Sequence, residues 1–213
     1  MTNKEIITFL TSTTVNAGFI DKLKIKYRPI ICPFNELINY AQNEQSVFDI
    51  GCGSGQFCAL IANYTPVKKI KGIEINDRLV NNAKQVNKQF SDTKSIVFDV
   101  FDGNTIPNDI ADYDLIYMID VYHHIPKNIR EAFMKQLFDK MKTGAKLMFK
   151  DIDAASPFVL CNKLHDLVFA QEIGNEISFK HAKSMLSKLG YKIIEEYATT
   201  VFVYPHYFIL AQK

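Results

Sequence analysis

The stretch "FDIGCGSGQF", residues 48–57, places three glycines at alternate positions directly after a short apolar run. Glycine has no Cβ, so a turn built from Gly51, Gly53 and Gly55 lets the main chain approach a bulky ligand closely. The residues that follow have apolar side chains at helical spacing, and free N–H groups at the start of a helix suit a carboxylate or a phosphate. The pattern therefore predicts a strand, a tight ligand-binding turn and a helix.

From residue 47 onward, short runs rich in β-branched and aromatic residues alternate with stretches whose apolar residues lie three and four positions apart. The expected strands are 47–50, 69–75, 95–100, 113–120, 145–153, 191–197 and 207–212. This alternation is typical of a parallel sheet with helices on both faces. The last two runs are too close for a crossover helix, so the last strand is expected to be antiparallel. The sequence predicts an α/β, Rossmann-like sheet of seven mostly parallel strands.

Two segments fall outside this alternation, and both are expected to be helical cover. Residues 1–46 precede the first strand, and residues 154–177 lie between the fifth strand and the last helix. Open α/β sheets bind ligands beyond the carboxyl ends of their strands, where an insert that follows a strand also lies. We therefore expect one main domain over residues 47–213, with an N-terminal cover and a second cover over the cleft.

Composition narrows the class of protein. The chain has 213 residues, of which 47% are hydrophobic and 23% charged, as is ordinary for a soluble globular protein. Its net charge of +2 and the lack of a long Lys/Arg run make nucleic acid an unlikely partner. Its four cysteines form no C-x-x-C pair and no long apolar segment is present, which predicts a cytoplasmic protein without disulfides or a membrane span. The oligomeric state is not indicated.

The glycine turn departs from the dinucleotide-binding pattern G-x-G-x-x-G, because Gln56 stands where the third glycine would be. Asp49 also occupies a position that is usually apolar in that pattern. The stretch D-I-G-C-G-S-G instead resembles the first motif of class I S-adenosylmethionine-dependent methyltransferases, D/E-x-G-x-G-x-G, at every fixed position. The resemblance runs from about residue 47 to residue 213. It implies S-adenosylmethionine as the cofactor and methyl transfer as the reaction.

Further motifs suggest where the cofactor binds. Glu74, at the end of the second expected strand, is placed to accept hydrogen bonds from a ribose diol, although an NAD-binding protein would also have an acid there. "FDGNTIP", residues 101–107, is similar to the family segment that holds the adenine amino group, which favours Asp102 over Asp99. "MIDVYHHIP", residues 118–126, looks like the family segment that lines the methionine moiety. The cofactor-binding residues implied are Asp49, Gly51, Cys52, Gly53, Gly55, Glu74, Ile75, Asp102, Gly103 and Asp120.

The methyl acceptor should lie near polar residues that follow the strands. Methyl transfer is an in-line displacement, and a hydroxyl acceptor must also lose a proton. The candidate catalytic residues are His123, His165 and His206, the last of them in a loop expected at 203–208. Candidate substrate-binding residues are Tyr27, Arg28, His124, Asp151, Asn162 and Tyr204. Each also has a plainer interpretation, as a packed histidine, a solvent-facing helix stripe or a turn residue.

Narrower families do not fit. The Asn/Asp-Pro-Pro-Tyr/Phe box of amino-directed nucleic-acid methyltransferases is replaced by "IDVYHH", residues 119–124, and no double-glutamate hairpin is found. The Asp-Asn pair of metal-dependent relatives is missing, so no metal site is expected. The prediction is methyl transfer to oxygen, nitrogen or carbon of a small metabolite. A methyltransferase acting on a protein or RNA, and a non-catalytic cofactor-binding regulatory subunit, are the alternatives.

Overall fold

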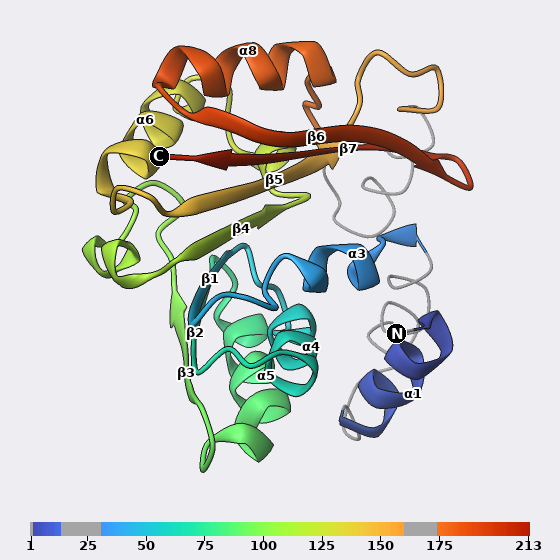
Figure 1. Ribbon diagram of the computed structural model, residues 1–213, viewed down its shortest axis with the longest axis vertical. Coiled ribbons are helices and arrows are strands. Elements are labelled where there is room, and N and C mark those ends of the chain that lie inside the picture. Colours follow the sequence, from blue (N-terminus) through green and yellow to red (C-terminus); the bar gives the residue numbers. More distant parts are fainter. Residues whose placement is uncertain (1, 14–30, 160–173) are drawn as a thin grey trace. The chain divides into compact units, whose positions relative to one another are not determined.

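A computed structural model describes residues 2–13, 31–159 and 174–213 of the chain (Figure 1). The chain forms two compact units, residues 1–101 and 102–213. The strands have the order β3-β2-β1-β4-β5-β7-β6 in a sheet that is parallel except where β7 pairs. The predicted seven-stranded, mostly parallel α/β fold is therefore confirmed.

The first unit contains three parallel strands and the helices that cover them. Its elements are α1 (Asn3–Thr13), α3 (Phe34–Asn39), β1 (Ser46–Ile50), α4 (Gln56–Tyr64), β2 (Lys69–Glu74), α5 (Asp77–Asn87), η1 (Lys88–Phe90) and β3 (Ser95–Val100). Every residue of β1 is buried, as in a strand covered on both faces. The helix α5 buries Val80, Ala83 and Val86, which recur at helical spacing. In β3, by contrast, only Phe98 is fully buried, as is typical of an edge strand.

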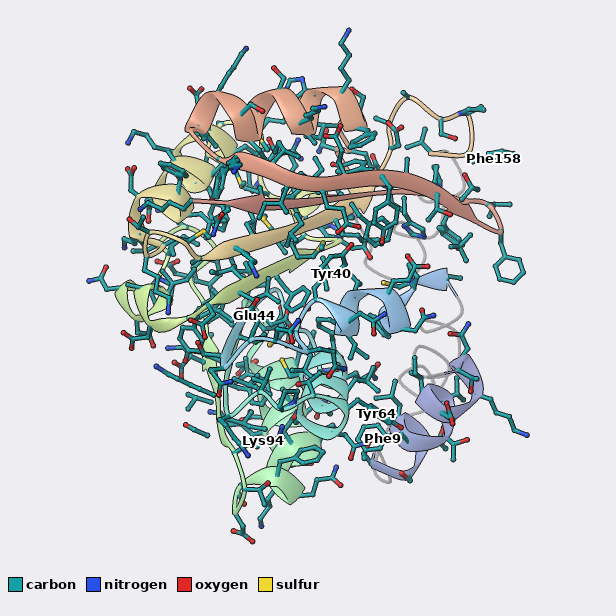
Figure 2. The ribbon with its side chains drawn as sticks, in the orientation of Figure 1. Phe9, Tyr40, Glu44, Tyr64, Lys94 and Phe158 are labelled. Carbon is teal, nitrogen blue, oxygen red and sulfur yellow. The ribbon has the colours of Figure 1, made fainter. Side chains whose placement is uncertain are left out.

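Aromatic contacts join α1 to the rest of the first unit. The ring of Phe9 meets the ring of Tyr64 edge-on, with centroids 5.6 Å apart, and lies 6.4 Å from Phe90 (Figure 2). Nearby, Lys94 donates from Nζ to the carbonyl oxygens of Thr65 and Val67, and burial lowers the pKa of Lys94. The helices α1 and α3 lie within the predicted N-terminal cover, while residues 14–30 lie outside the described part of the chain.

The described residues of the second unit form four strands and two helices of 11 residues. Its elements are η2 (Asn108–Asp112), β4 (Leu115–Ile119), η3 (Tyr122–His124), α6 (Arg130–Lys140), β5 (Lys146–Ile152), α8 (Phe179–Leu189), β6 (Lys192–Val201) and β7 (Tyr204–Gln212). The strands β4 and β5 are parallel, and β7 is antiparallel to both β5 and β6. As its position predicts, Gly190 ends α8 in the left-handed conformation, with φ at 105°.

The prediction of a loop at residues 203–208 is wrong, because most of these residues belong to a strand. The strand β6 continues to Val201 and β7 begins at Tyr204, so only Phe202 and Val203 form the turn of a tight hairpin. Proline lacks an N–H group, but Pro205 lies before the pairing of β7 with β5, which begins at His206. His206 is thus a strand residue.

The ends of the predicted cover at residues 154–177 are joined by hydrogen bonds. The N–H of Ala154 donates to the carbonyl of Ile177 at 3.3 Å, and the N–H of Asp153 donates to that of Pro205 at 2.7 Å. The N–H of Asn175 donates to the carbonyl of His123 at 2.9 Å. Residues 160–173 of this cover lie outside the described part. In the part that is described, no helix has the length and apolar character to cross a membrane.

Candidate active site

The glycine turn connects β1 to α4 in the first unit. Gly51, Gly53 and Gly55 have φ angles of 74°, 54° and 70°, which are left-handed conformations that favour glycine. The N–H groups of Gly51 and Cys52 donate to the carbonyl oxygen of Ile73 in β2, at 2.8 and 3.1 Å. The turn is therefore fixed to the neighbouring strand by main-chain contacts, as the three alternate glycines predict.

The carboxylate of Glu74 lies directly beside this turn. One of its oxygens accepts a hydrogen bond from the N–H of Gly53 at 3.1 Å, and the other accepts one from Asn76 at 3.1 Å. These contacts orient the carboxylate, and an ionised carboxylate has further lone pairs with which to accept hydrogen bonds. The next side chain, Ile75, is 66% exposed. An oriented acceptor thus lies next to an exposed apolar surface.

Asp49 lies in the core beneath the turn. Its side chain accepts a hydrogen bond from the thiol of Cys58 at 3.3 Å, and only 3% of the residue is exposed. Burial raises the pKa of Cys58, with a further contribution from Asp49, so this thiol stays protonated and donates. Cys52 is also buried, and a Cβ on Gly72 would come within 2.7 Å of its sulfur. Asp49 and Cys52 therefore support the turn from below.

Asp102 begins the second unit and is exposed. Its Oδ1 accepts hydrogen bonds from the N–H groups of Asn104 and Thr105 at 2.8 and 2.7 Å. The contacts from Thr105 and Asn104 lower the pKa of Asp102, so its carboxylate stays ionised. Gly103 has a φ of 80°. Asp99, the competing candidate, instead forms an ion pair with Lys71 at 2.8 Å.

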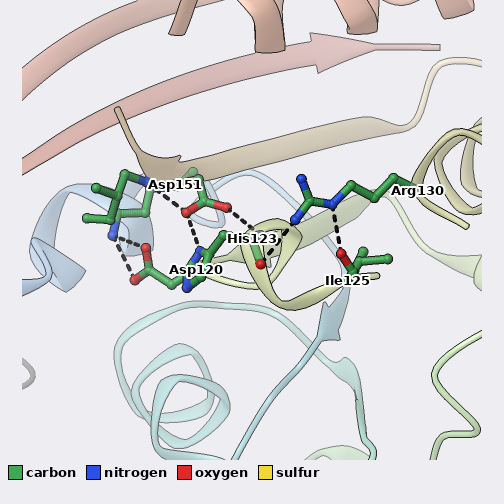
Figure 3. Close-up of polar contacts among 7 residues, drawn as sticks. Asp120, His123, Ile125, Arg130 and Asp151 are labelled. Carbon is green, nitrogen blue, oxygen red and sulfur yellow. Dashed lines mark hydrogen bonds and ion pairs between the residues drawn. The ribbon is translucent and has the colours of Figure 1, made fainter. Parts of the chain in front are cut away.

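An ion pair between a buried lysine and a carboxylate that is 25% exposed lies where β4 ends. The two carboxylate oxygens of Asp120 are 2.6 and 2.7 Å from Nζ of Lys150, whose side chain is fully buried on β5 (Figure 3). Asp120 has a φ of 55°, which is uncommon for a residue other than glycine. Burial alone would raise the pKa of Asp120. Lys150, together with the nearby His206 and His123, instead holds the pKa of Asp120 well below its usual range.

The side chains of His123 and Asp151 form a second buried pair. Nδ1 of His123 lies 2.5 Å from Oδ1 of Asp151, and the N–H of His123 donates to Oδ2 at 3.2 Å (Figure 3). Both side chains are almost completely buried. Because an ionised carboxylate can only accept, the imidazole donates from Nδ1, and in the neutral form of the ring Nε2 is then the acceptor. The exposed ring of His124 lies against that of His123, with centroids 4.1 Å apart.

The strand β7 places aromatic residues beside this pair. Tyr207 lies opposite Asp151 in the β5–β7 register, and His206 lies opposite Ile152. Burial raises the pKa of Tyr207, and its hydroxyl has no hydrogen-bond partner among the residues that the structure describes. The half-buried Tyr204 stacks on His206, with ring centroids 6.3 Å apart.

The structure thus brings several predicted residues together within the second unit, namely Asp120, His123, His124, Asp151, Tyr204 and His206. It also adds Lys150, and Arg130, which contacts the turn that holds His123. The position of Lys150 directly after the apolar residues Leu147, Met148 and Phe149 of an expected strand was the available signal for it. Four predicted residues lie outside the described part: Tyr27, Arg28, Asn162 and His165. Within the described ranges, no group of three or more His, Cys, Asp or Glu residues is arranged to hold a metal ion.

The family model and the relatives found by comparison with known proteins are all methyltransferases. The family described as "Methyltransferase domain" matches residues 25–196, which is more than half of the chain. An O-methyltransferase from Pyrenophora dematioidea is 25% identical over 155 residues, covering 71% of this chain and 55% of that protein. A sterol 4-C-methyltransferase from Caenorhabditis elegans is 27% identical over 146 residues, covering 68% and 42%. The chain thus spans about half the length of these two curated relatives.

Solved structures share the fold. Magnesium protoporphyrin IX methyltransferase from Synechocystis PCC 6803, with bound SAH, has a TM-score of 0.70 at 16% identity and covers 99% of this chain and 95% of its own. A SAM-dependent methyltransferase from Archaeoglobus fulgidus has a TM-score of 0.68 at 15% identity, with coverage of 92% and 100%. At these identities the likeness is one of fold.

Proposed function

Because this chain belongs to a family of S-adenosylmethionine-dependent methyltransferases, we propose that it transfers a methyl group to a hydroxyl oxygen of a small molecule. The observation that carries the proposal is the buried pair of His123 and Asp151, whose geometry leaves Nε2 of the imidazole as a proton acceptor. A hydroxyl is a weak nucleophile until its proton is removed, and a histidine with a fixed tautomer suits that step.

The first unit has groups of the right chemistry for the cofactor. The oriented carboxylate of Glu74 would accept hydrogen bonds from a ribose diol, and the exposed Ile75 would pack against an adenine ring. The glycine turn would receive the methionine portion at its open main chain. When bound, S-adenosylmethionine supplies a methyl group on a positively charged sulfur, which becomes a neutral thioether after transfer.

The remaining predicted residues take supporting roles in the proposal. Asp49 and Cys52 support the turn, while Asp102 and Gly103 would contact adenine, as the family resemblance implies. Asp120, held ionised by Lys150, would lie near the methionine portion.

In the second unit, His123 is the proposed general base. Its Nε2 would accept the hydroxyl proton as the oxygen attacks, and Asp151 would hold the ring and stabilise the imidazolium that forms. Asp151 therefore takes an orienting role, because its side chain is buried and engaged by His123 and Ile152. The exposed His124 and the half-buried Tyr204 are the proposed acceptor contacts nearby.

The experiment that tests this proposal measures S-adenosylhomocysteine release over a panel of phenolic, carboxylic and amine metabolites, with mass spectrometry of the product. We expect turnover with a hydroxyl acceptor and a roughly 10²- to 10⁴-fold lower kcat for His123→Asn. Turnover with amines alone, or full activity of His123→Asn, would overturn the hydroxyl proposal. Tight cofactor binding with no turnover across the panel would instead indicate a macromolecular acceptor or a regulatory subunit.

Cofactor binding is tested separately by calorimetry with S-adenosylhomocysteine. Gly53→Val should abolish the binding heat, because the added side chain fills the open face of the turn and disfavours its φ of 54°. Asp139→Asn is the control, since the carboxylate of Asp139 forms an exposed ion pair with Lys135 within α6 of the second unit. Equal binding by the two variants would contradict the assignment of the turn.

A further inference from the structure

Arg130 is a buried cation whose polar contacts are with main-chain oxygens. It is the first residue of α6 and is 7% exposed. Its Nε donates to the carbonyl of Ile125 at 2.7 Å, and its Nη2 donates to the carbonyl of His123 at 3.0 Å (Figure 3). Among the described residues, no carboxylate forms an ion pair with this guanidinium. Burying a charged side chain costs free energy, so the burial of Arg130 calls for a structural or functional reason.

The same guanidinium also contacts an aromatic ring in that turn. It lies 4.7 Å from the ring centroid of Tyr122, close enough for a cation–π interaction. Tyr122 in turn packs edge-on against Phe149 of β5, with centroids 5.5 Å apart. The Arg130 side chain therefore contacts Tyr122, His123 and Ile125.

The turn that carries His123 needs such support. It is a single 3₁₀ turn, Tyr122–His124, in which only the carbonyls of Val121 and Tyr122 accept bonds from the N–H groups of His124 and Ile125. A helix that short has poor hydrogen-bond geometry, and its last carbonyls are left for outside donors. Arginine presents its donors in a rigid planar fork, so it can bond two carbonyls at once, whereas lysine is a point charge on a flexible stem.

We infer that Arg130 is a positioning residue for His123. Asp151 holds this residue by its N–H and its ring, and Arg130 holds it by its carbonyl, which also accepts a hydrogen bond from the N–H of Asn175. Together they fix the main chain and the imidazole, so that Nε2 is presented in one direction. This inference rests on the proposed role of His123 as the base.

The test is a double-mutant cycle on kcat, measured at saturating S-adenosylmethionine and acceptor. Arg130→Lys keeps the charge but loses the fork, and we expect kcat to fall roughly 10²-fold, the scale expected when a reacting group is misplaced by about 1 Å. In the His123→Asn background, Arg130→Lys should have little further effect, because the group it positions is already gone. Arg78→Lys, an exposed arginine in α5, is the control and should leave kcat unchanged.

A merely structural role would give a different pattern. If Arg130→Lys lowers the residual activity of His123→Asn by the same factor as it lowers that of the wild type, or if kcat is unchanged, the inference is overturned. Tyr122→Leu provides a second variant in case Arg130→Lys folds poorly. It removes the ring under the guanidinium and should show the same non-additivity with a smaller loss.

A spectroscopic measurement separates this inference from the proposed function. We expect the ring nitrogen signals of His123 in NMR spectra to report the Nδ1–H tautomer in the wild type and a mixture of tautomers in Arg130→Lys. If His123→Asn is fully active, the base assignment fails, and the NMR result alone then decides whether Arg130 orients the ring. An unchanged His123 spectrum in folded Arg130→Lys overturns the positioning role.

Discussion

Gly55 is the residue of the glycine turn for which the surroundings leave no space. A Cβ at this position would lie 2.7 Å from Cβ of Ala83 and 2.8 Å from Nδ2 of Asn87, both in α5. The amide of Asn87 also donates to the carbonyl of Gly55 at 3.0 Å. Two requirements therefore meet at this residue, a left-handed φ of 70° and close approach of a neighbouring helix.

These two requirements can be separated by comparing two alanine variants. Gly144 also has a positive φ, at 86°, but nothing lies within 4 Å of its Cβ position. Gly144→Ala should therefore cost only backbone strain, about 1–2 kcal/mol of unfolding free energy. Gly55→Ala should cost about 1–3 kcal/mol more, because it also overpacks against α5. Urea denaturation of both variants measures the difference, and equal losses would contradict the steric argument.

The Asp120–Lys150 pair predicts a pH dependence of stability. The pKa of Asp120 is lowered in the folded state, so the folded protein binds fewer protons at this group than the unfolded chain does. The resulting stabilisation is complete above the unfolded pKa of about 3.9 and is lost as the pH falls below it. Asp120→Asn should lower the unfolding free energy at pH 7 by about 3 kcal/mol, since it leaves a buried lysine unpaired.

The difference between wild type and Asp120→Asn should narrow as the pH is lowered from 5 toward 3, as measured by urea denaturation at each pH. Asp139→Asn, which breaks the exposed Lys135–Asp139 pair, is the control and should cost less than about 1 kcal/mol at every pH. A gap for Asp120→Asn that widens in acid would show that the pair does not hold this carboxylate ionised.

For single residues, the backbone conformation of the glycine turn was easier to predict from the sequence than the contacts of buried charged side chains. The glycine turn could be predicted, because alternate glycines after a strand indicate a backbone with positive φ angles. Lys150 and Arg130 could not, because a charged side chain is normally exposed. Their burial depends on partners at Asp120 and His123, which the fold brings near. The pairing of His123 with Asp151 likewise required β4 and β5 to be adjacent.

Among the elements, α5 is tied to the candidate cofactor site through the residue that caps its N-terminus. The side chain of Asn76 caps this helix by accepting from the N–H groups of Arg78 and Leu79, and its own N–H donates to Glu74. Asn76→Ala should lower the unfolding free energy by about 1 kcal/mol, because two helix donors lose their acceptor. Asn76→Asp keeps a good capping oxygen and should stay within about 0.5 kcal/mol of wild type. Thermal or urea unfolding distinguishes them, and equal losses would contradict the capping role.

Several element boundaries were predicted correctly from the pattern of apolar residues. The third strand was expected at residues 95–100 and found there, and the last helix begins at Phe179 as its pattern indicates. The error lay at the final hairpin, where Pro205 suggested a loop. Pro205 lies opposite Thr200 of β6, before the pairing of β7 with β5 begins, so a proline is tolerated at this end of the strand.

For the whole molecule, cofactor binding should raise stability by mass action. A ligand at 100 times its Kd adds about 2.7 kcal/mol to the unfolding free energy, so S-adenosylhomocysteine should raise Tm by roughly 5–10 °C. Glu74→Gln replaces the oriented carboxylate and should weaken binding about 10- to 100-fold. Its Tm shift at the same ligand concentration should be correspondingly smaller. A full shift in this variant, measured by differential scanning fluorimetry, would contradict the ribose assignment.

The parallel direction of the early strands and the reversal of the last one could be predicted, because a parallel connection needs a crossover helix and the last connection is too short for one. The division into two compact units between residues 101 and 102 could not be predicted, since no change of composition marks it. It depends on which strands share contacts after folding, a property of the packed chain as a whole.

The hydrogen bond between Ala154 and Ile177 holds together the two ends of a stretch whose sequence and length can change during evolution. The stretch between these residues leaves and returns at one place, and Asn175 is fastened to His123 just before its end. Lengthening a connection whose ends are held together costs little, about 0.6 kcal/mol for each doubling of its length. Divergence or cassette exchange that replaces the part of this stretch before Asn175 would therefore leave His123 with its contacts to Asn175, Asp151 and Arg130.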